Sequence, residues 1–337
     1  MKKLKILMSL LTEENPYQRL QATIAQEIAG NLGVDLQIAF AKNDALFQSE
    51  QLLNAIHSSK HSPLDGIVCA PIGTTRTTLM QVARSAVAAG IGWAVLNREI
   101  DYQAELRSSF QVPIFSVLPD QEAIGKMQGQ QVGMLLPRGG HILYLLGPTG
   151  NSVSEKRLAG MQTGLSSGIG LKTLVGDWSK ESGFRAVARW LQLRTANAPA
   201  IELLASQNDD MVIGAREAFE EMTNGDEKDR WLGIPYVGCD CCPGAGREWV
   251  HRGLLASSVI NPPTAGLALQ MMVQAVRKHL ATTRANDSCP GIVSPGRKTP
   301  QQTVAQHLDR SRQSARNFIA RKPIAAPSLF PLSLATI

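Results

Sequence analysis

Aromatic residues are scarce in this chain of 337 residues, at 5%, and charged residues make up only 18%. Apolar residues still reach 44%, enough for one large or two medium hydrophobic cores, which excludes a disordered or fibrous protein. No run approaches the roughly 18 to 20 uninterrupted apolar residues of a membrane-spanning helix. The apolar run from Leu4 to Leu11 is short, contains Lys5 and lacks a small-x-small cleavage site. We therefore predict a first β-strand there, not an export signal.

Cysteine is also rare, and the five residues form a poor disulfide framework because their number is odd and their spacing is crowded. This pattern fits a reducing compartment better than an oxidising one, although an exported protein can keep free thiols. Cys239-x-Cys241-Cys242 with nearby His251 lacks the two separated Cys pairs that structural zinc prefers. We favour ordinary loop cysteines over a metal site. The five are Cys69, Cys239, Cys241, Cys242 and Cys289.

Motifs of nucleotide binding and nucleophilic catalysis are missing. Gly147-Pro148-Thr149-Gly150-Asn151 lies where a phosphate loop would lie but lacks the Gly-Lys-Ser/Thr ending, and no Gly-x-Gly-x-x-Gly follows another strand. None of the histidines has a Gly-x-Ser-x-Gly elbow beside it. We expect no cofactor and no enzyme activity. The remaining enzyme alternative uses Asp240 or Asp177 as an acid or base, without a second carboxylate predicted beside either.

Positive charge is confined to the end of the chain. The net charge is +6, and residues 295–337 hold seven basic side chains against one acidic, so residues 1–294 are neutral. No helix-turn-helix pattern precedes Lys5, and a neutral body does not suit a polyanion. We expect no nucleic-acid partner and interpret residues 310–337 as a basic, flexible tail.

Short apolar runs alternate with amphipathic segments twice along the chain, which predicts parallel sheets wound with helices. Strands are expected at Leu4–Leu11, Asp35–Ala41, Gly66–Ala70, Gly92–Leu96, His141–Leu146, Leu171–Gly176, Ile201–Ala205, Pro235–Cys239 and Leu254–Ile260. Helices are expected at Pro16–Leu32, Ala45–Ser59, Thr75–Ala89, Ser154–Ser167, Ser182–Thr195, Met211–Met222 and Thr264–Leu280. The last helix is expected to pack back on the first half.

Polar residues gather directly after the strands. Because the carboxyl ends of parallel strands form the ligand crevice of such sheets, seven polar clusters indicate two half-sites that face each other. The alternative is that Asn, Asp and Ser simply cap the following helices. The repetition, together with Arg98 and Trp178, favours a site. The clusters are Glu14-Asn15, Asn43-Asp44, Asn97-Arg98-Glu99, Thr149-Gly150-Asn151, Asp177-Trp178, Asn208-Asp209 and Asp240.

These side chains suit a small, neutral ligand rich in hydroxyl groups. Vicinal hydroxyls donate and accept, so they match planar carboxylate, amide and guanidinium groups that bind two atoms at once. Aromatic faces such as those of Trp178 and Tyr17 cover the C–H face of a sugar ring. The polar set is Asn15, Arg98, Arg157, Asn208 and Asp240.

A resemblance to a known family rests on segments that are weak singly and specific in their order and spacing. They are Thr12 to Tyr17, Asp65 to Pro71, Ala88 to Ile91, Asn97 to Glu99, Gly147 to Arg157, Gly176 to Trp178, Gln207 to Ala215 and Val237 to Asp240. From about Lys5 to Val304 the chain resembles the type I periplasmic sugar-binding proteins, the ribose-binding group in particular. The effector domains of lactose-repressor-type regulators share this fold.

The resemblance implies two doubly wound α/β lobes joined by a three-crossover hinge, with the ligand between them. It assigns residues 1–118 and 261–294 to the N-terminal lobe, and residues 119–260 and 295–309 to the C-terminal lobe. The implied ligand contacts are Asn15, Tyr17, Asn97, Arg98, Arg157, Trp178, Asn208, Asp240 and Asn261. This chain departs from the pattern at Asn97, where Asp is common, at Gln18, where a second aromatic is common, at Asn261, where Gln is frequent, and at Cys241-Cys242, where Gly is usual.

The function that follows is a monomeric solute-binding protein that closes on a monosaccharide or polyol and delivers it to a transporter permease. The resemblance implies a periplasmic location. A cytoplasmic sugar sensor that signals to a kinase or regulator is the alternative, because the chain shows no export signal.

Overall fold

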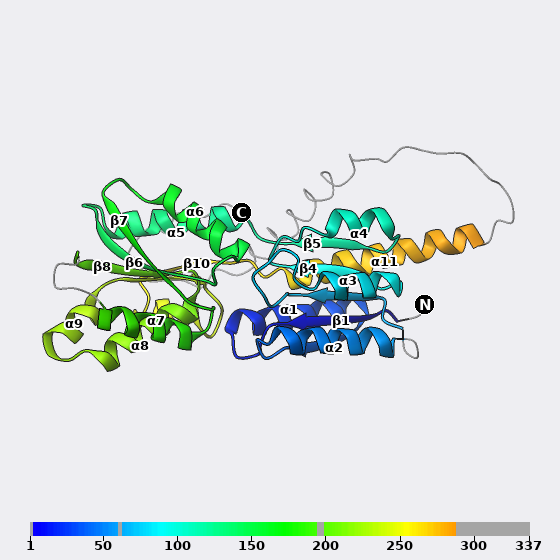
Figure 1. The fold of residues 1–337 in the computed structure, drawn as a ribbon, viewed down its shortest axis with the longest axis horizontal. Helices are drawn as coiled ribbons and strands as arrows, with labels where there is room; N and C mark the ends of the chain where they lie inside the picture. Colours follow the sequence, from blue (N-terminus) through cyan, green and yellow to red (C-terminus); the bar gives the residue numbers. More distant parts are fainter. Residues whose placement is uncertain (1–2, 60–62, 194–198, 288–337) are drawn as a thin grey trace. The chain divides into compact units, whose positions relative to one another are not determined.

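A computed structural model of the chain describes residues 3–59, 63–193 and 199–287. These residues form two parallel five-stranded sheets, each covered by helices on both faces, as Figure 1 shows. The predicted α/β class with two doubly wound lobes is confirmed.

The N-terminal lobe has the strand order β2-β1-β3-β4-β5, and every adjacent pair is parallel. Its strands are β1 (Lys5–Leu10), β2 (Asp35–Phe40), β3 (Gly66–Cys69), β4 (Gly92–Leu96) and β5 (Ile114–Val117). Its helices are α1 (Pro16–Leu32), α2 (Ala45–Ser58), α3 (Met80–Ala88), α4 (Gln103–Ser109) and α11 (Ala265–Asp287).

Alternate residues of β1 supply the two faces of this sheet, as the twofold repeat of a strand requires. Ile6 and Met8 pack with α1 and with the late helix α11, while Leu7 packs with α2, α3 and α4 on the other face. Helix α11 therefore completes the core of a lobe whose other elements come from the first third of the chain.

The C-terminal lobe has the order β10-β9-β8-β6-β7 and is also parallel. Its strands are β6 (Gly140–Leu146), β7 (Ile169–Val175), β8 (Ile201–Ser206), β9 (Tyr236–Asp240) and β10 (Ser257–Ile260). Its helices are α5 (Gln121–Leu135), α6 (Ser152–Gly164), α7 (Lys180–Leu193), α8 (Asp209–Met222), α9 (Gly225–Gly233) and α10 (Gly246–His251). Helices α5 and α6 cover one face of the sheet, and α7 and α8 cover the other.

Local signals set the helix boundaries where the prediction was accurate. The Asn15 side chain accepts a hydrogen bond from the Gln18 backbone N–H at 3.1 Å, Pro16 opens α1, and Gly33 ends it with a left-handed φ of 64°. The Asp44 side chain caps α2 at its predicted start in the same way, whereas Asn151 caps α6 at Ser152, two residues before its predicted start.

The predicted helix Thr75–Ala89 was wrong at its start. Hydroxyl contacts among the threonines make a turn instead, including Thr78 Oγ1 to the Thr75 carbonyl at 2.8 Å. Leu79 then has a left-handed φ of 62°, so α3 begins only at Met80. The prediction also missed the four-residue strand β5 and the helices α4, α5, α9 and α10, because short elements and the Gln- and Gly-rich α5 carry little periodic signal.

The chain passes between the lobes twice within the described residues, at 118–120 after β5 and at 261–264 before α11. The predicted third crossing, the return of residues 295–309 to the C-terminal lobe, and the basic tail 310–337 lie outside the described residues, as does Cys289. None of the helices that the structure describes is long and apolar enough to cross a membrane.

Glycines allow α5 and α6 to pack backbone to backbone. A Cβ on Gly160 would lie 2.0 Å from the Glu122 carbonyl oxygen, and one on Gly125 would lie 2.1 Å from the Arg157 carbonyl oxygen. Since real Cβ contacts are never this short, the two helices must separate if either glycine gains a side chain.

We expect Gly160→Ala to destabilise the fold by about 1–3 kcal/mol or more, because overpacking at a backbone contact forces α5 and α6 apart. Gly30→Ala is the matched control: it is also in a helix, α1, but nothing lies within 4 Å of its added Cβ. The control should be neutral or gain about 0.5–1 kcal/mol. Urea unfolding of both variants checks this, and equal stabilities would contradict it.

Candidate functional site

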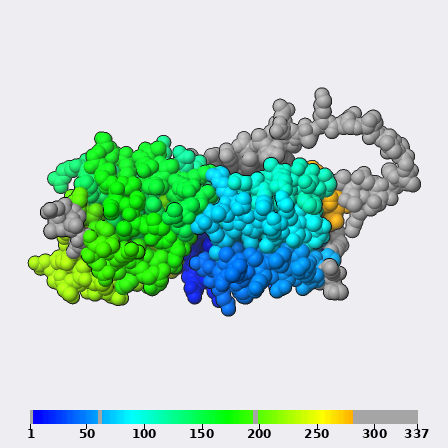
Figure 2. Space-filling view, in the orientation of Figure 1, coloured from blue at the N-terminus to red at the C-terminus, as the bar shows by residue number. Residues whose placement is uncertain are grey.

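The carboxyl ends of the two sheets meet at a cleft of about 840 Å³. Its walls come from the loops that follow β1 to β4 in one lobe and β6 to β9 in the other, together with the crossover at Asn261. In the space-filling view of Figure 2, atoms of the N-terminal lobe (blue to cyan) lie directly against atoms of the C-terminal lobe (green).

All nine residues that the sequence predicts as ligand contacts line this one cleft, although they come from positions spread over nearly 250 residues of the chain. They are Asn15, Tyr17, Asn97, Arg98, Arg157, Trp178, Asn208, Asp240 and Asn261. Their assignment as ligand contacts stays a prediction, while their convergence is an observation.

Three of these residues have left-handed backbones although none is glycine. The φ angles are 66° at Asn97, 76° at Trp178 and 106° at Asp240. Such conformations are costly for L-residues and concentrate at functional sites. Asp240 ends β9, Asn97 directly follows β4, and Trp178 lies three residues after β7, so each unusual backbone lies at the strand ends that form the cleft.

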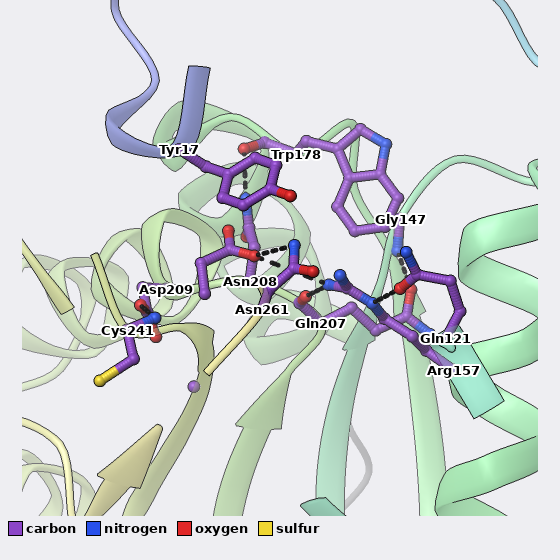
Figure 3. Close-up of polar contacts among 12 residues, drawn as sticks. Tyr17, Gln121, Gly147, Arg157, Trp178, Gln207, Asn208, Asp209, Cys241 and Asn261 are labelled. Atoms are coloured by element: carbon purple, nitrogen blue, oxygen red, sulfur yellow. Dashed lines mark hydrogen bonds and ion pairs between the residues drawn. The ribbon is translucent and has the colours of Figure 1, made fainter. Parts of the chain in front are cut away.

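Arg157, on α6, is the central cation of the cleft and is almost fully buried. Its Nε donates to Gln121 Oε1 at 2.8 Å, and its Nη1 donates to the Gln207 carbonyl and lies 3.9 Å from Asp240 Oδ1. Its guanidinium also lies 5.9 Å from the centre of the Trp178 ring. Figure 3 shows these groups converging. The guanidinium is thus fixed before any ligand arrives.

Asp240 and Asn261 form the acceptor side of the cleft. Asn261 Nδ2 donates to Asp240 Oδ1 at 3.0 Å. Burial raises the pKa of Asp240 to about 6, while the Arg157 charge and the Asn261 hydrogen bond oppose the shift. Asn261 Oδ1 is buried and has no hydrogen-bond partner among the described residues. Since buried polar groups normally make hydrogen bonds, this oxygen is available to accept one from a bound molecule.

Asn97 joins the N-terminal wall to the second crossover. Its Oδ1 accepts from Thr264 Oγ1 at 2.8 Å, from Gln21 Nε2 at 3.3 Å and from Tyr17 Oη at 3.4 Å. Tyr17 Oη lies closer, at 3.1 Å, to the Pro262 carbonyl, and its single proton can be donated fully to only one of these two acceptors. Because Oδ1 already accepts from Thr264 and Gln21, Asn97 has its amide N–H groups left for a ligand.

Arg98 follows Asn97 and is only 6% exposed, yet its Nη1 has no hydrogen-bond partner within the described part of the chain. Trp178 supplies an aromatic wall, and its indole lies so close to Gly147 that a Cβ there would be 2.1 Å from the ring. Asn208 holds this wall, because its Nδ2 donates to the Trp178 carbonyl at 2.8 Å. Its Oδ1 meanwhile accepts from the Met211 backbone N–H at 3.0 Å. Asn208 therefore caps α8 and also positions Trp178 in the cleft.

Sequence reasoning did not select several residues that organise the cleft. Asp209 accepts from the Cys241 backbone N–H and from Ser258 Oγ, both at 2.7 Å, and so holds the turn after Asp240. Burial and the neighbouring Asp240 charge raise the pKa of Asp209 well above its usual range. Gln121 and Gln207 orient Arg157. Gln207 stands beside the polar cluster at 208–209 and was findable, whereas Gln121 begins a helix that the pattern did not predict.

Several contacts bridge the two lobes. Asn15 Nδ2 donates to Asp210 Oδ2 at 2.9 Å, and Lys156 pairs with Glu99. Tyr17 packs against Cys242 and Ala245 of the other lobe. Asn15, Tyr17 and Asp210 also line the cleft, so part of what holds the lobes together belongs to its walls.

The cysteines of the described residues form no disulfide. Cys69, Cys239 and Cys242 are buried, and burial raises the pKa of each thiol. Within the described ranges, no group of three or more His, Cys, Asp or Glu side chains is arranged to hold a metal ion.

A two-lobed α/β fold with a polar cleft between the carboxyl ends of its sheets defines a ligand-binding protein of the periplasmic type. The profile of the family described as "Periplasmic binding protein domain" matches residues 6–280. The chain belongs to this family, and the resemblance noted in the sequence is confirmed.

Individual relatives agree with this. A xylitol-binding protein of Mycolicibacterium smegmatis is 27% identical over 203 residues, which cover 59% of this chain and 51% of the relative, so the match spans about half its length. A galactofuranose-binding protein of Escherichia coli is 24% identical over 268 residues, 78% of this chain and 79% of the relative.

Among solved structures, a solute-binding protein of an ABC transporter from Actinobacillus succinogenes with bound D-allose superposes with a TM-score of 0.68 at 20% identity. The match covers 82% of this chain and 92% of that one. A Caulobacter myo-inositol binding protein gives 0.64 at 20% identity, over 83% and 88% of the two chains. These likenesses show the fold.

Asp210 should make stability depend on pH. Burial, then repulsion from Asp240, raise its pKa to about 7, so the folded protein binds this proton more tightly than the unfolded chain. The stabilisation is complete below the ordinary Asp pKa and is lost as the pH rises through about 7. Asp210→Asn keeps an acceptor for Asn15, so we expect a higher unfolding midpoint than wild type at pH 8 and no difference near pH 4.

Thermal unfolding at both pH values tests this. Asp44→Asn removes the same charge at the N-terminus of α2 and measures the combined effect of net charge and of the charge at a helix N-terminus. If the unfolding midpoint of Asp210→Asn at pH 8 rises no more than that of this control, the ionised Asp210 carboxylate does not destabilise the folded state.

Proposed function

We propose that this protein is a solute-binding protein that closes on a small hydroxylated ligand for uptake by an ABC transporter. The observation that carries the proposal is a cleft lined by two buried polar atoms that have no hydrogen-bond partner among the residues that the structure describes. These atoms are Arg98 Nη1 on one side and Asn261 Oδ1 at the crossover.

The chemistry of the cleft suits hydroxyl groups attached to adjacent carbons. Asp240 and Asn261 accept hydrogen bonds, Arg98 and the Asn97 amide donate them, and Trp178 offers an apolar face. A sugar or polyol ring has C–H groups on its faces and hydroxyl groups around its edge. It can therefore contact the donors, the acceptors and the aromatic face of the cleft. The binding of xylitol and galactofuranose by curated relatives, and the D-allose and myo-inositol in similar structures, support this class of ligand.

Ligand binding is expected to favour the closed state, because contacts from both lobes exist together only there. The crossover at 261–264 carries part of the site itself. Asn261 contacts Asp240 in one lobe, while Pro262 and Thr264 contact Tyr17 and Asn97 in the other. A ligand that orders these groups thereby also sets the crossover.

The proposed partner is the permease of an ABC transporter, and the proposed location is the periplasm, as the family implies. A sensor that signals to a kinase or regulator inside the cell is the other reading of the same binding site. Cell fractionation separates them: recovery in the periplasmic fraction supports transport, and recovery in the cytosol supports the sensor.

Thermal unfolding in the presence of pentoses, hexoses and polyols at millimolar concentration tests the binding function. A ligand at about 1,000 times its dissociation constant stabilises the folded state by about 4 kcal/mol, which moves the midpoint by several degrees. A panel without any shift would overturn the proposal.

Asp240→Asn should weaken binding of the best panel compound by tenfold or more in calorimetry, because a buried carboxylate that accepts ligand hydroxyls becomes a half-donor amide at a cost of about 1–3 kcal/mol. Asp177→Asn is the matched control at the same rim, since its side chain is 48% exposed and is bound to Arg185. The control should change affinity less than twofold. Equal affinities in the two variants would exclude Asp240 from the site.

A further inference from the structure

Arg98 is a buried cation without a counter-charge. It is 6% exposed and lines the cleft, and no carboxylate pairs with it among the described residues. The ionisable groups that face it are the Tyr102 phenol and the Cys69 thiol, and burial raises the pKa of both, so both are neutral. An arginine does not lose its proton under these conditions, so the positive charge remains.

The other guanidinium in the interior of the cleft, that of Arg157, already has a carboxylate beside it. Arg157 lies 3.9 Å from Asp240. At the rim, Asp177 pairs with Arg185, and Glu217 pairs with Lys180 at 2.6 Å. Of the two guanidinium groups in the interior of the cleft, Arg98 is therefore the one without a carboxylate.

Asn97, beside Arg98, also offers donors to a ligand. Its Oδ1 accepts from Gln21 and Thr264, so its N–H groups remain for a ligand. The N-terminal wall thus presents donors from Arg98 and Asn97, whereas Asp240 and Asn261 present acceptors. The hydroxyls of a neutral polyol can bind both sides, but they bring no negative charge to balance Arg98.

We infer that the ligand is a sugar acid, an aldonate or uronate, whose carboxylate pairs with Arg98 while its hydroxyls bind Asp240 and Asn261. A planar carboxylate fits the fork of a guanidinium, and its single negative charge balances a single unpaired cation. A phosphate monoester brings about −1.5 to −2 charges at pH 7 and leaves an excess. This inference rests on the proposed binding function and narrows its ligand class.

Calorimetry with matched pairs tests the inference on the full chain. The pairs are D-glucuronate with D-glucose, D-galacturonate with D-galactose, and D-gluconate with D-sorbitol, with D-glucose 6-phosphate as the phosphate arm. We expect at least one acid to bind tenfold or more tightly than its neutral partner. A neutral compound that binds as tightly as its acid, or a phosphate that binds more tightly than any acid, overturns the inference while the binding function stands. Absence of binding throughout the panel overturns both.

Two variants locate the carboxylate. Asn97→Asp places a negative charge beside Arg98 and keeps an acceptor for Tyr17, Gln21 and Thr264, and Asp tolerates the left-handed backbone. It should weaken binding of the acid at least tenfold and leave the neutral partner unchanged or tighter. Asn54→Asp is the control, because it adds the same charge at an exposed position of the same lobe, on α2 and outside the cleft, and should change affinity less than twofold.

Arg98→Gln is the second variant and removes the cation. It should abolish the preference for acids, with the unfolding midpoint recording that the variant is folded. An acid preference that survives both Arg98→Gln and Asn97→Asp would place the carboxylate elsewhere and overturn the assignment.

Discussion

The buried guanidinium of Arg157 is the constraint around which the cleft is organised. A charge with this burial must be compensated, and the compensation comes from separate elements: the Asp240 carboxylate at the end of β9, the Gln207 carbonyl after β8 and the Gln121 amide at the start of α5. Each of these groups is itself held. Gln207, for example, donates to the Ser154 carbonyl at 2.8 Å and accepts from the Gly147 N–H at 2.8 Å. The strand ends of the C-terminal lobe therefore form one network.

The same network explains the unusual backbone at the cleft. Asp240 and Cys241 have φ angles of 106° and 50°, and the turn they make is held by Asp209, which accepts from the Cys241 N–H. Gly238 and Gly246 leave room for the Asp209 carboxylate, since a Cβ at either would lie 2.0 Å or less from its oxygens. The buried Asp209 carboxylate thus stabilises the strained turn that places the Asp240 carboxylate in the cleft.

The predicted ligand contacts and the crossover between the lobes share residues. The crossover at 261–264 hydrogen-bonds to Asp240 on one side and to Tyr17 and Asn97 on the other. The hydrogen bond from Asn15 to Asp210 joins two residues of the cleft lining, and the Lys156–Glu99 ion pair joins the residues next to Arg157 and Arg98. The predicted ligand contacts and the groups that hold the lobes together are therefore neighbours.

The sequence by itself determined the fold class, because alternating apolar strands and amphipathic helices survive any detail of packing. It also determined the helix α1 to the residue, since a cap, a proline and a left-handed glycine are local signals. It also led us to expect that the predicted ligand contacts converge, because most of them follow strands whose ends share one edge of a parallel sheet. Short elements such as β5 could not be predicted, because four residues are too few to show a repeating pattern of apolar residues.

Only the tertiary structure decided what each polar residue does. Asn208, Asp209 and Asp210 are consecutive and look alike in the sequence. In the fold, the first caps α8 and holds Trp178, the second holds the turn after Asp240, and the third bridges to Asn15. Likewise, no pattern shows that Asp240 balances Arg157 while Arg98 is left without a carboxylate. Such roles depend on which side chains meet across distant segments, and local propensity carries no information about those meetings.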